Sequence, residues 1–477
     1  MPTSLRLLTH TPAAAPSPDA VIAAVATHDC PAALESADPS RGRFTIVACD
    51  PLEVATWQLG SADPFAEMRA SLNRTTGVLS DPATAFPPAA HAFPCGWIGY
   101  FAYEAGRYIE RLPATTRMDV GLPVARFALY DSAAVFDAVT GTWTLVAVDL
   151  PPSSPNHDNT RPPAHARLTQ WEATLNQAQT VARRQPTRSN PTHNMSRADY
   201  IRMVTKAIEY IAAGDIFQVN LARRETYPQT EPALATYLRL RQTNPAAYAA
   251  FLAWQEPTGG PAALISSSPE LLLQLRGREV LTRPIKGTRP RSPDPQEDQA
   301  QAQALCASPK DRAELAMIVD LERNDLGRVC EYGTVRVLSH TQSPADPYTL
   351  EQHPTVFHLV ADVVGRLAPQ HDAIDLLRAC FPGGSITGAP KVRAMQIVDE
   401  LEPTERSVYT GAVGYFGLDG SMTFNIAIRT LVAARGRLHL YVGGGIVADS
   451  RPEDEYRETQ AKALGLRRAL GLTTEID

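Results

Sequence analysis

The run of capped helices and β-branched strands between residues 196 and 470 constrains the fold of this chain most strongly. Strand-like segments at residues 262–266 and 271–275 follow each other directly, whereas longer helical segments are inserted at irregular intervals. A doubly wound parallel sheet needs a regular strand–helix–strand rhythm, and the sequence does not have one. The pattern therefore predicts an α+β fold.

Several element ends in this region carry explicit signals. Ser196 and Asp199 form a capping box, with Asp in place of Glu, that begins a helix ended by Gly214. We expect a second helix from Pro309 to about residue 319, and a third with Pro390 in its first turn. The remaining expected elements are a strand at residues 334–338, a strand pair at residues 421–432 and 437–442 that leads into Gly443-Gly444-Gly445, and a last helix over residues 452–470.

Composition divides the chain into three regions. Residues 1–150 contain short strand-like runs bounded by turn signals, such as Phe44–Ala48 and residues 143–148. Residues 151–195 are rich in Pro, Asn, Thr and Arg, which predicts a linker interrupted by one helix near residues 168–182. Residues 196–470 form the third and longest region.

Charge and cysteine content exclude several functional classes. The net charge of −6 and the scattered basic residues argue against a nucleic-acid binder. The six cysteines form no CxxC pair, so neither a disulfide framework nor a zinc site is expected, and a reducing compartment is the simpler inference. No apolar stretch approaches the length of a membrane span. We therefore expect a cytoplasmic protein.

Lys286 is a single amine between Arg283 and Arg289 in a segment punctuated by Pro and Gly. Neighbouring fixed cations disfavour a further positive charge, so we expect them to lower the pKa of Lys286 toward the nucleophilic range. The alternative is a solvated lysine in a basic turn, which is favoured for any lysine considered alone.

Two helix faces are acidic. Asp311 and Glu314 are three residues apart, as are Glu455 and Glu458, so each pair projects from one face of its helix. If the faces converge, the four carboxylates would bind a hard divalent cation, most simply Mg²⁺. The alternative is solvated faces that complement the helix dipole, and spacing alone favours that alternative.

Two glycine-rich segments have the composition of anion-binding loops. Residues 443–445 are three consecutive glycines, and residues 381–391 lead into a helix N-terminus. Backbone amides at such positions can approach a phosphate or carboxylate closely. The alternative is an ordinary Gly-rich turn, and residues 381–391 lack the spacing of a nucleotide-binding loop.

Six longer motifs resemble those of the chorismate-utilising enzymes, in the order of that family. They are residues 214–221, 284–288, 311–325, 381–395, 443–450 and 455–459. The resemblance covers about residues 196–470 as the chorismate-binding catalytic domain, and more weakly residues 1–150 through Leu34-Glu35-Ser36 and residues 96–104. It implies the fold of anthranilate synthase component I, with a β-sheet sandwich core surrounded by helices.

Two positions select a branch within this family. Anthranilate synthases are expected to carry alanine where this chain has Lys286, whereas aminodeoxychorismate synthases carry lysine. Isochorismate and salicylate synthases place a water-activating lysine where this chain has Gln218. The resemblance therefore favours the aminodeoxychorismate synthase component I branch, which adds ammonia to chorismate in 4-aminobenzoate and folate biosynthesis. The alternative is anthranilate synthase component I, in tryptophan biosynthesis.

The resemblance also implies roles for individual residues. Lys286 would attack C2 of chorismate and form a covalent adduct, and Glu270 would be the acid that assists departure of the C4 hydroxyl. Glu314 and Glu458 would hold Mg²⁺ directly. Asp311, where the family is expected to have glutamate, and Glu455 would act through bound water. The implied substrate-binding residues are Arg429, Tyr409, Gly443, Gly444, Gly445 and Lys462, with His358 and Thr387 along the ring.

Ammonia requires a source, and the sequence contains no glutaminase nucleophile motif. We therefore expect a separate glutamine amidotransferase subunit as partner, and no fused lyase. Glu35, Ser36, Pro245 and Tyr248 resemble the tryptophan-feedback pocket of anthranilate synthases, which predicts a retained tryptophan site. A non-catalytic protein with this fold is a further alternative, but the complete set of carboxylates together with Lys286 argues against it.

Overall fold

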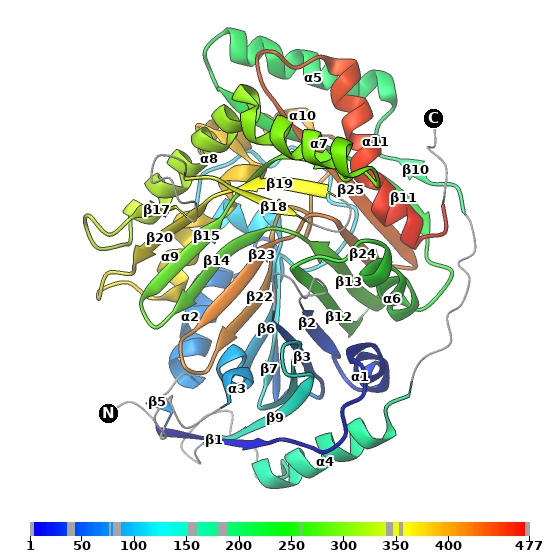
Figure 1. The fold of residues 1–477 in the computed structure, drawn as a ribbon, viewed down its shortest axis with the longest axis vertical. Helices are drawn as coiled ribbons and strands as arrows, with labels where there is room; N and C mark the ends of the chain where they lie inside the picture. Colours follow the sequence, from blue (N-terminus) through cyan, green and yellow to red (C-terminus); the bar gives the residue numbers. More distant parts are fainter. Residues whose placement is uncertain are drawn as a thin grey trace.

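The computed structural model describes residues 4–35, 43–75, 78–79, 87–150, 160–179, 189–257, 259–339, 347–352 and 356–472. Strands of two large sheets cross the middle of the molecule, and helices lie around them (Figure 1). This arrangement confirms the predicted α+β fold. None of the helices in the described ranges is long and apolar enough to cross a membrane.

The larger sheet has thirteen strands and combines N-terminal and C-terminal parts of the chain. Its β2 and β3 pair with each other, and β2 also pairs with β12. In sheet order the strands are β10 (Thr192–His193), β11 (Gln218–Pro228), β25 (Arg437–Ile446), β24 (Thr430–Ala434), β13 (Gly260–Ser268), β12 (Tyr248–Glu256), β2 (Ala32–Glu35), β3 (Phe44–Ala48), β8 (Ser132–Asp137), β9 (Thr142–Asp149), β1 (Ser4–His10) and β5 (Val78–Leu79), with β21 (Gly388–Ala389) on β11.

The second large sheet has nine strands, and a small sheet of three strands carries the predicted nucleophile. The nine are β17 (Arg336–Leu338), β20 (Asp362–Arg366), β15 (Glu279–Arg283), β14 (Leu271–Arg276), β23 (Met422–Ile426), β22 (Ala412–Gly417), β6 (Gly96–Phe101), β7 (Ala125–Tyr130) and β4 (Glu53–Trp57). The three are β16 (Ile285–Pro290), β19 (Val356–Val360) and β18 (Thr349–Gln352).

The helices pack on these sheets through separate apolar clusters. One cluster joins the two large sheets, for example through Phe127 and Phe424 of one and Leu264 of the other. A second lies between the thirteen-stranded sheet and α1, α4, α6 and α11, and a third lies under α5 and α10. The helices are α1 (Pro18–Val25), α2 (Pro64–Thr75), α3 (Pro88–Ala92), α4 (Ala164–Gln177), α5 (Arg197–Ala212), α6 (Ala233–Thr243), α7 (Pro295–Ala307), α8 (Pro309–Gly327), α9 (Ala373–Cys380), α10 (Lys391–Leu401) and α11 (Pro452–Ala469), with short 3₁₀ turns at Tyr103–Tyr108 and Gly384–Ile386.

The predicted capping box is confirmed, because Ser196 and Asp199 exchange both hydrogen bonds at the start of α5. The prediction for α8 was too short, because the helix continues to Gly327. In the added part Glu322 is buried, and it accepts a hydrogen bond from Thr282 at 3.1 Å. The helix predicted inside the linker is α4, whose bounds lie a few residues earlier than expected.

The strand predicted over residues 421–432 was wrong as one element. It is two strands in different sheets, β23 and β24, and Arg429 between them has a left-handed φ of 52°. The chain therefore crosses from one large sheet to the other at Arg429. The glycines at 443–445 were expected to follow a strand, but they lie inside β25, opposite residues 220–222 of β11.

Candidate active site

Lys286 lies on β16 next to a bulge in the pairing with β19. Gly287 has φ +74°, and a Cβ there would lie 2.9 Å from Cβ of Asp311, so the bulge requires glycine. The bulge directs the Lys286 side chain inward, and its Nζ donates to the carbonyl of Ser385 at 3.2 Å.

The pKa of Lys286 is lowered, as predicted, but the predicted cause was wrong. Burial is the main cause, and Lys462 adds to it, whereas Glu270 and Glu314 oppose the shift. The two flanking arginines do not contribute because each is neutralised by its own carboxylate. Arg283 pairs with Asp362, and Arg289 pairs with Asp311 at 2.9 Å.

Glu270 lies beside the lysine in the turn between β13 and β14. Only 4% of the residue is exposed, and its Oε1 accepts the amide of Ile285 at 3.4 Å. Burial raises the pKa of Glu270, and the charge of Lys286 offsets this in part. A carboxyl group with a raised pKa next to an amine with a lowered pKa can provide an acid and a nucleophile in one place.

Gln218, at the start of β11, is fully buried. Its side-chain amide nitrogen and oxygen both have no hydrogen-bond partner among the described residues. A Cβ on Gly445 would lie 2.7 Å from that nitrogen, so the amide lies directly over the glycine strand. Unpartnered buried polar atoms are rare and destabilising, which indicates that a ligand completes these hydrogen bonds.

The acidic side chains come from two helices far apart in sequence. Glu314 projects from α8, and Glu455 and Glu458 project from α11. A Cβ on Gly444 would lie 3.0 Å from Oε2 of Glu455 and 3.8 Å from Oε1 of Glu458. The missing side chain of this glycine therefore allows the α11 carboxylates to approach the strand.

The three carboxylates differ in electrostatics. Burial raises the pKa of Glu314 and of Glu455, and neighbouring carboxylates raise both further. For Glu458 burial acts in the same direction, but Lys462 at 2.5 Å outweighs it and holds the pKa below the ordinary value. A positive ligand would lower the raised pKa values of Glu314 and Glu455 and stabilise their charged forms.

The carboxylates offer only oxygen donors, which suits Mg²⁺. Lys462 contacts Glu458 at 2.5 Å, and Lys310 contacts Glu314 at 3.9 Å. These two amines neutralise the carboxylates that a divalent cation would otherwise neutralise. Within the described ranges, no three of the four predicted carboxylates bring one oxygen each within 4.8 Å of one another. Asp311 is held by Arg289 instead.

Arg429 and Tyr409 form a pair of candidate anion-binding groups near Glu458. Arg429 donates to the carbonyl of Lys462. Burial lowers the pKa of its guanidinium, and no carboxylate of the described chain lies at ion-pair distance from it. Tyr409 stacks on Tyr441 with ring centroids 5.3 Å apart, and burial raises its pKa to about 12. A partly buried guanidinium without a carboxylate partner in the described chain is well suited to bind one from a substrate.

The remaining predicted substrate contacts border this site. Lys462 Nζ donates to the carbonyl of Gly443 at 3.0 Å. Thr387 is fully buried and donates to the carbonyl of Gly383 at 2.9 Å, and its own carbonyl accepts the amide of Asn220. His358 lies on β19 with its Nδ1 3.0 Å from the hydroxyl of Thr288.

The predicted tryptophan pocket belongs to a different part of the thirteen-stranded sheet. Glu35 on β2 lies opposite Ala249 and therefore next to Tyr248 of β12. Its carboxylate is buried and is held by Arg241 at 2.8 Å and by the hydroxyl of Tyr237. Pro245 follows α6, and Ser36 lies outside the described residues.

Two residues of the site were not predicted from the sequence. Ser385 accepts a hydrogen bond from the lysine amine through its carbonyl, and its buried side chain lies beside Glu270, whose pKa it lowers. Lys310 contacts Glu314 from the preceding turn of α8. The sequence signal for Ser385 is its place in the glycine-rich loop 381–391, for which only an anion-binding role of the backbone amides was predicted. For Lys310 the sequence signal is its i,i+4 spacing from Glu314.

Comparison with known proteins identifies the family. The family model for chorismate binding enzymes matches residues 33–468. The chain is 40% identical over 450 residues to anthranilate synthase component 1 of Streptomyces coelicolor, covering 92% of this chain and 83% of that protein. It is 43% identical over 364 residues to aminodeoxychorismate synthase component 1 of Klebsiella aerogenes, covering 76% and 74%.

A solved structure supports the same family assignment. The crystal structure of anthranilate synthase component I from Streptococcus pneumoniae superimposes with a TM-score of 0.75 at 29% identity, covering 89% of this chain and 92% of that one. The curated relatives divide between two activities, so their names alone do not select one. The fold, the buried lysine–carboxylate site and these relatives together place the chain in the family of chorismate-utilising enzymes.

Proposed function

We propose that this chain is an aminodeoxychorismate synthase component I, which replaces the C4 hydroxyl of chorismate with ammonia to give 4-amino-4-deoxychorismate. The observation that carries the proposal is the Lys286 amine. It is partly buried, its pKa is lowered, and it lies beside Glu270, whose pKa is raised. The family resemblance assigns alanine to this position in anthranilate synthases, and an alanine could not form a covalent adduct.

The proposed reaction is two displacements. The neutral amine of Lys286 forms a bond to C2 as the C4–O bond breaks, and the proton of Glu270 leaves with the hydroxyl as water. Ammonia then forms a bond to C4 as the C2–N bond to Lys286 breaks, and the surplus proton passes to the Glu270 carboxylate. Chorismate and ammonia give aminodeoxychorismate and water, and both side chains return to their initial states. Splitting one difficult substitution into two is the general benefit of covalent catalysis.

Glu314 and Glu458 are the residues that would hold Mg²⁺ directly, with Asp311 and Glu455 acting through water. When bound, the ion would neutralise the ring carboxylate of chorismate and stabilise the charge of the departing group. Arg429, Tyr409, Lys462 and the glycines of β25 would bind the remaining carboxylate, and His358 and Thr387 would line the ring. Raised pKa values at Glu314 and Glu455 support this role, because a cation would relieve both.

Gln218 supports ammonia rather than water as the second nucleophile. An amide does not titrate and so cannot take a proton from water, but its free carbonyl oxygen can accept a hydrogen bond from ammonia. We further propose that the ammonia comes from a glutamine amidotransferase subunit in the cytoplasm. The relatives are named as component 1, which implies a second component for those proteins.

The reaction product tests the proposal. The protein is incubated with chorismate, MgCl₂ and an ammonium salt, with and without the lyase that converts aminodeoxychorismate to 4-aminobenzoate. We expect 4-aminobenzoate only when the lyase is present. Fluorescent anthranilate formed without the lyase would instead assign the chain to anthranilate synthase component I, the alternative supported by the Streptomyces coelicolor relative.

We also propose that Glu35, Ser36, Pro245 and Tyr248 retain a tryptophan site. The neighbouring positions of Glu35 and Tyr248 on paired strands support it. Because Arg241 already holds Glu35, the ammonium group of tryptophan would have to share that carboxylate. Isothermal titration with tryptophan tests this directly, and absence of binding at millimolar concentration would exclude the site.

A further inference from the structure

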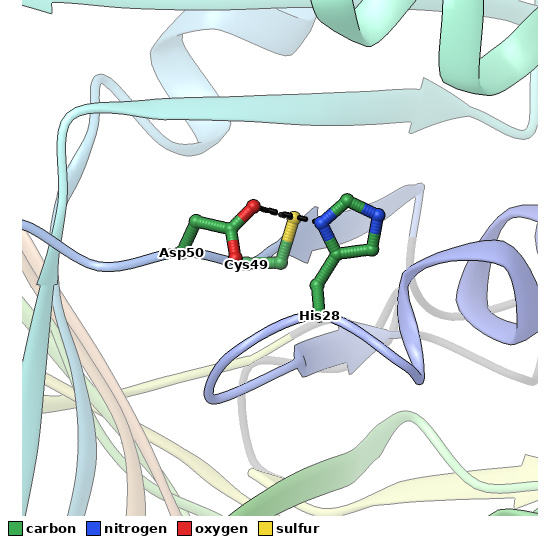
Figure 2. A group of neighbouring side chains, drawn as sticks. All are labelled: His28, Cys49 and Asp50. Carbon is green, nitrogen blue, oxygen red and sulfur yellow. Dashed lines mark hydrogen bonds and ion pairs between the residues drawn. The ribbon is translucent and has the colours of Figure 1, made fainter. Parts of the chain in front are cut away.

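A second group of potential metal ligands lies in the N-terminal part of the chain. His28 belongs to the loop between α1 and β2, and Cys49 and Asp50 follow directly after β3. Because β2 and β3 pair with Ala32 opposite Ala48, the two loops meet at the same end of this hairpin. Figure 2 shows the side chains of Cys49 and Asp50 directed toward the His28 ring.

One ligand atom from each of the three residues lies within 4.8 Å of the other two. His28 Nδ1 is 2.8 Å from Asp50 Oδ2, and Cys49 Sγ is 3.6 Å from the same oxygen. In the described part of the chain, no other group of three His, Cys, Asp or Glu residues meets this distance. This group could not be predicted from the sequence, because 20 residues separate His28 from Cys49.

The backbone holds the Asp50 carboxylate in place. Its Oδ1 accepts the amide of Asp29 at 3.0 Å, which leaves Oδ2 for His28 and Cys49. Arg161 fixes the Asp50 carbonyl at 2.7 Å. The side chains of His28 and Asp50 are 40% and 49% exposed, so an ion can reach them from solvent.

We propose that His28, Cys49 and Asp50 bind a divalent transition-metal ion of the Zn²⁺ class. One imidazole nitrogen, one sulfur and one carboxylate oxygen are three of the four ligands of a tetrahedral site, and the exposed face leaves the fourth position to water. The ion replaces the thiol proton, which leaves to solvent. Sulfur and imidazole ligands disfavour Mg²⁺, so this site is chemically distinct from the carboxylates of the active site. The bound ion would tie the α1–β2 loop to the end of β3.

Cobalt provides a direct test, because thiolate ligation to Co²⁺ gives an intense near-ultraviolet charge-transfer absorption. Co²⁺ is titrated into the full-length protein in excess Mg²⁺, which keeps hard-ion sites saturated, and Zn²⁺ is then added as competitor. We expect one-to-one binding with the sulfur band, and loss of the band as Zn²⁺ displaces Co²⁺. Absence of the band in the wild-type protein would overturn the proposal and leave a His28–Asp50 hydrogen bond beside an inert thiol.

Variants assign the ligands. Cys49→Ser should remove the band, and His28→Ala should weaken binding by more than the roughly 10–100-fold typical of changes around a ligand. His28 is exposed, so His28→Ala remains informative if Cys49→Ser folds poorly. Cys306→Ser is the matched control, because Cys306 is the one cysteine of the six that is not buried and it lies on α7. Wild-type affinity in His28→Ala, or loss of the band in Cys306→Ser, would also overturn the assignment.

Discussion

Buried charges occur in two kinds of place in this molecule, and the two differ in how completely the charges are paired. Around Glu225, Arg223 donates at 2.8 Å and Arg467 donates to both carboxylate oxygens. Burial would raise the pKa of Glu225, but these partners hold it below the ordinary value. At the candidate active site burial prevails instead: the pKa values of Glu270 and Glu314 are raised and that of Lys286 is lowered.

The difference separates structure from function. In the Glu225 cluster two arginines and the hydroxyl of Tyr227 bind the carboxylate, so this carboxylate needs no ligand. At the active site burial shifts the pKa values of Glu270, Glu314 and Lys286, because their charged forms lack sufficient partners in the protein. A substrate dianion together with a cation would supply those partners. Shifted pKa values produced by burial therefore indicate a site that is completed on binding.

The largest effect is expected at Lys286. Lys286→Ala removes the proposed nucleophile and should lower kcat for aminodeoxychorismate formation by about a thousandfold or more. Stability should change little, because a poorly matched buried amine is removed. The measurement is the lyase-coupled assay together with thermal unfolding.

The matched control is Lys206→Ala, which removes an exposed lysine of α5 that contacts Glu209 at 2.9 Å. This change should leave turnover unaltered. Turnover by Lys286→Ala close to that of the control would show that Lys286 is not a nucleophile.

The opposite behaviour is expected at the paired cluster. Glu225→Ala leaves Arg467 buried without its carboxylate and should lower the free energy of unfolding by about 3–5 kcal/mol. The kcat of the protein that remains folded should stay near the wild-type value. Urea denaturation measures the first quantity, and activity per folded molecule below the transition measures the second. A large loss of kcat with unchanged stability would remove the contrast between the two regions.

The sequence predicted local features of this contrast but not the pairing that creates it. The capping box at Ser196 and the i,i+3 acid pairs depend on neighbours within one helix, so they could be read directly. The approach of α8 and α11 to one site depends on tertiary packing between residues more than a hundred positions apart. The same holds for Arg429, whose exposure to the site arises where the chain leaves one sheet for the other. For Lys286 the direction of the pKa shift was predicted from the sequence, but its cause was not, because the flanking arginines pair with Asp362 and Asp311.

Glu270→Gln tests the acid. The variant keeps the shape but cannot donate the proton to the leaving hydroxyl, so kcat should fall by roughly 10²–10⁴-fold. Its stability should respond to pH in a defined way. The folded pKa of Glu270 is raised, so the wild-type protein loses stability as pH rises from the ordinary value through the folded one. Glu270→Gln should show a smaller decline than the wild-type protein when unfolding free energies are compared across that range, because Glu314 and Glu455 still contribute to it. An identical decline in both proteins would contradict the assignment.

The smallest effects concern the glycines of β25, where neighbouring positions belong to the two different classes. A Cβ on Gly443 would lie 2.5 Å from the carbonyl oxygen of Leu221, a backbone atom that cannot move aside. Gly443→Ala should therefore lower the free energy of unfolding by about 1–3 kcal/mol. The three atoms nearest to a Cβ on Gly444 are instead the ends of the Glu455, Glu458 and Lys462 side chains.

Gly444→Ala should therefore change the unfolding free energy by no more than about 0.5 kcal/mol, since flexible side chains can shift and alanine also restricts the unfolded chain. The methyl group would nevertheless displace the carboxylates proposed to hold Mg²⁺, so the Mg²⁺ concentration that gives half-maximal activity should rise. Activity titrated with MgCl₂ at saturating chorismate measures this. If Gly444→Ala instead destabilised the fold as much as Gly443→Ala, with no change in the Mg²⁺ requirement, Gly444 would belong to the structural class.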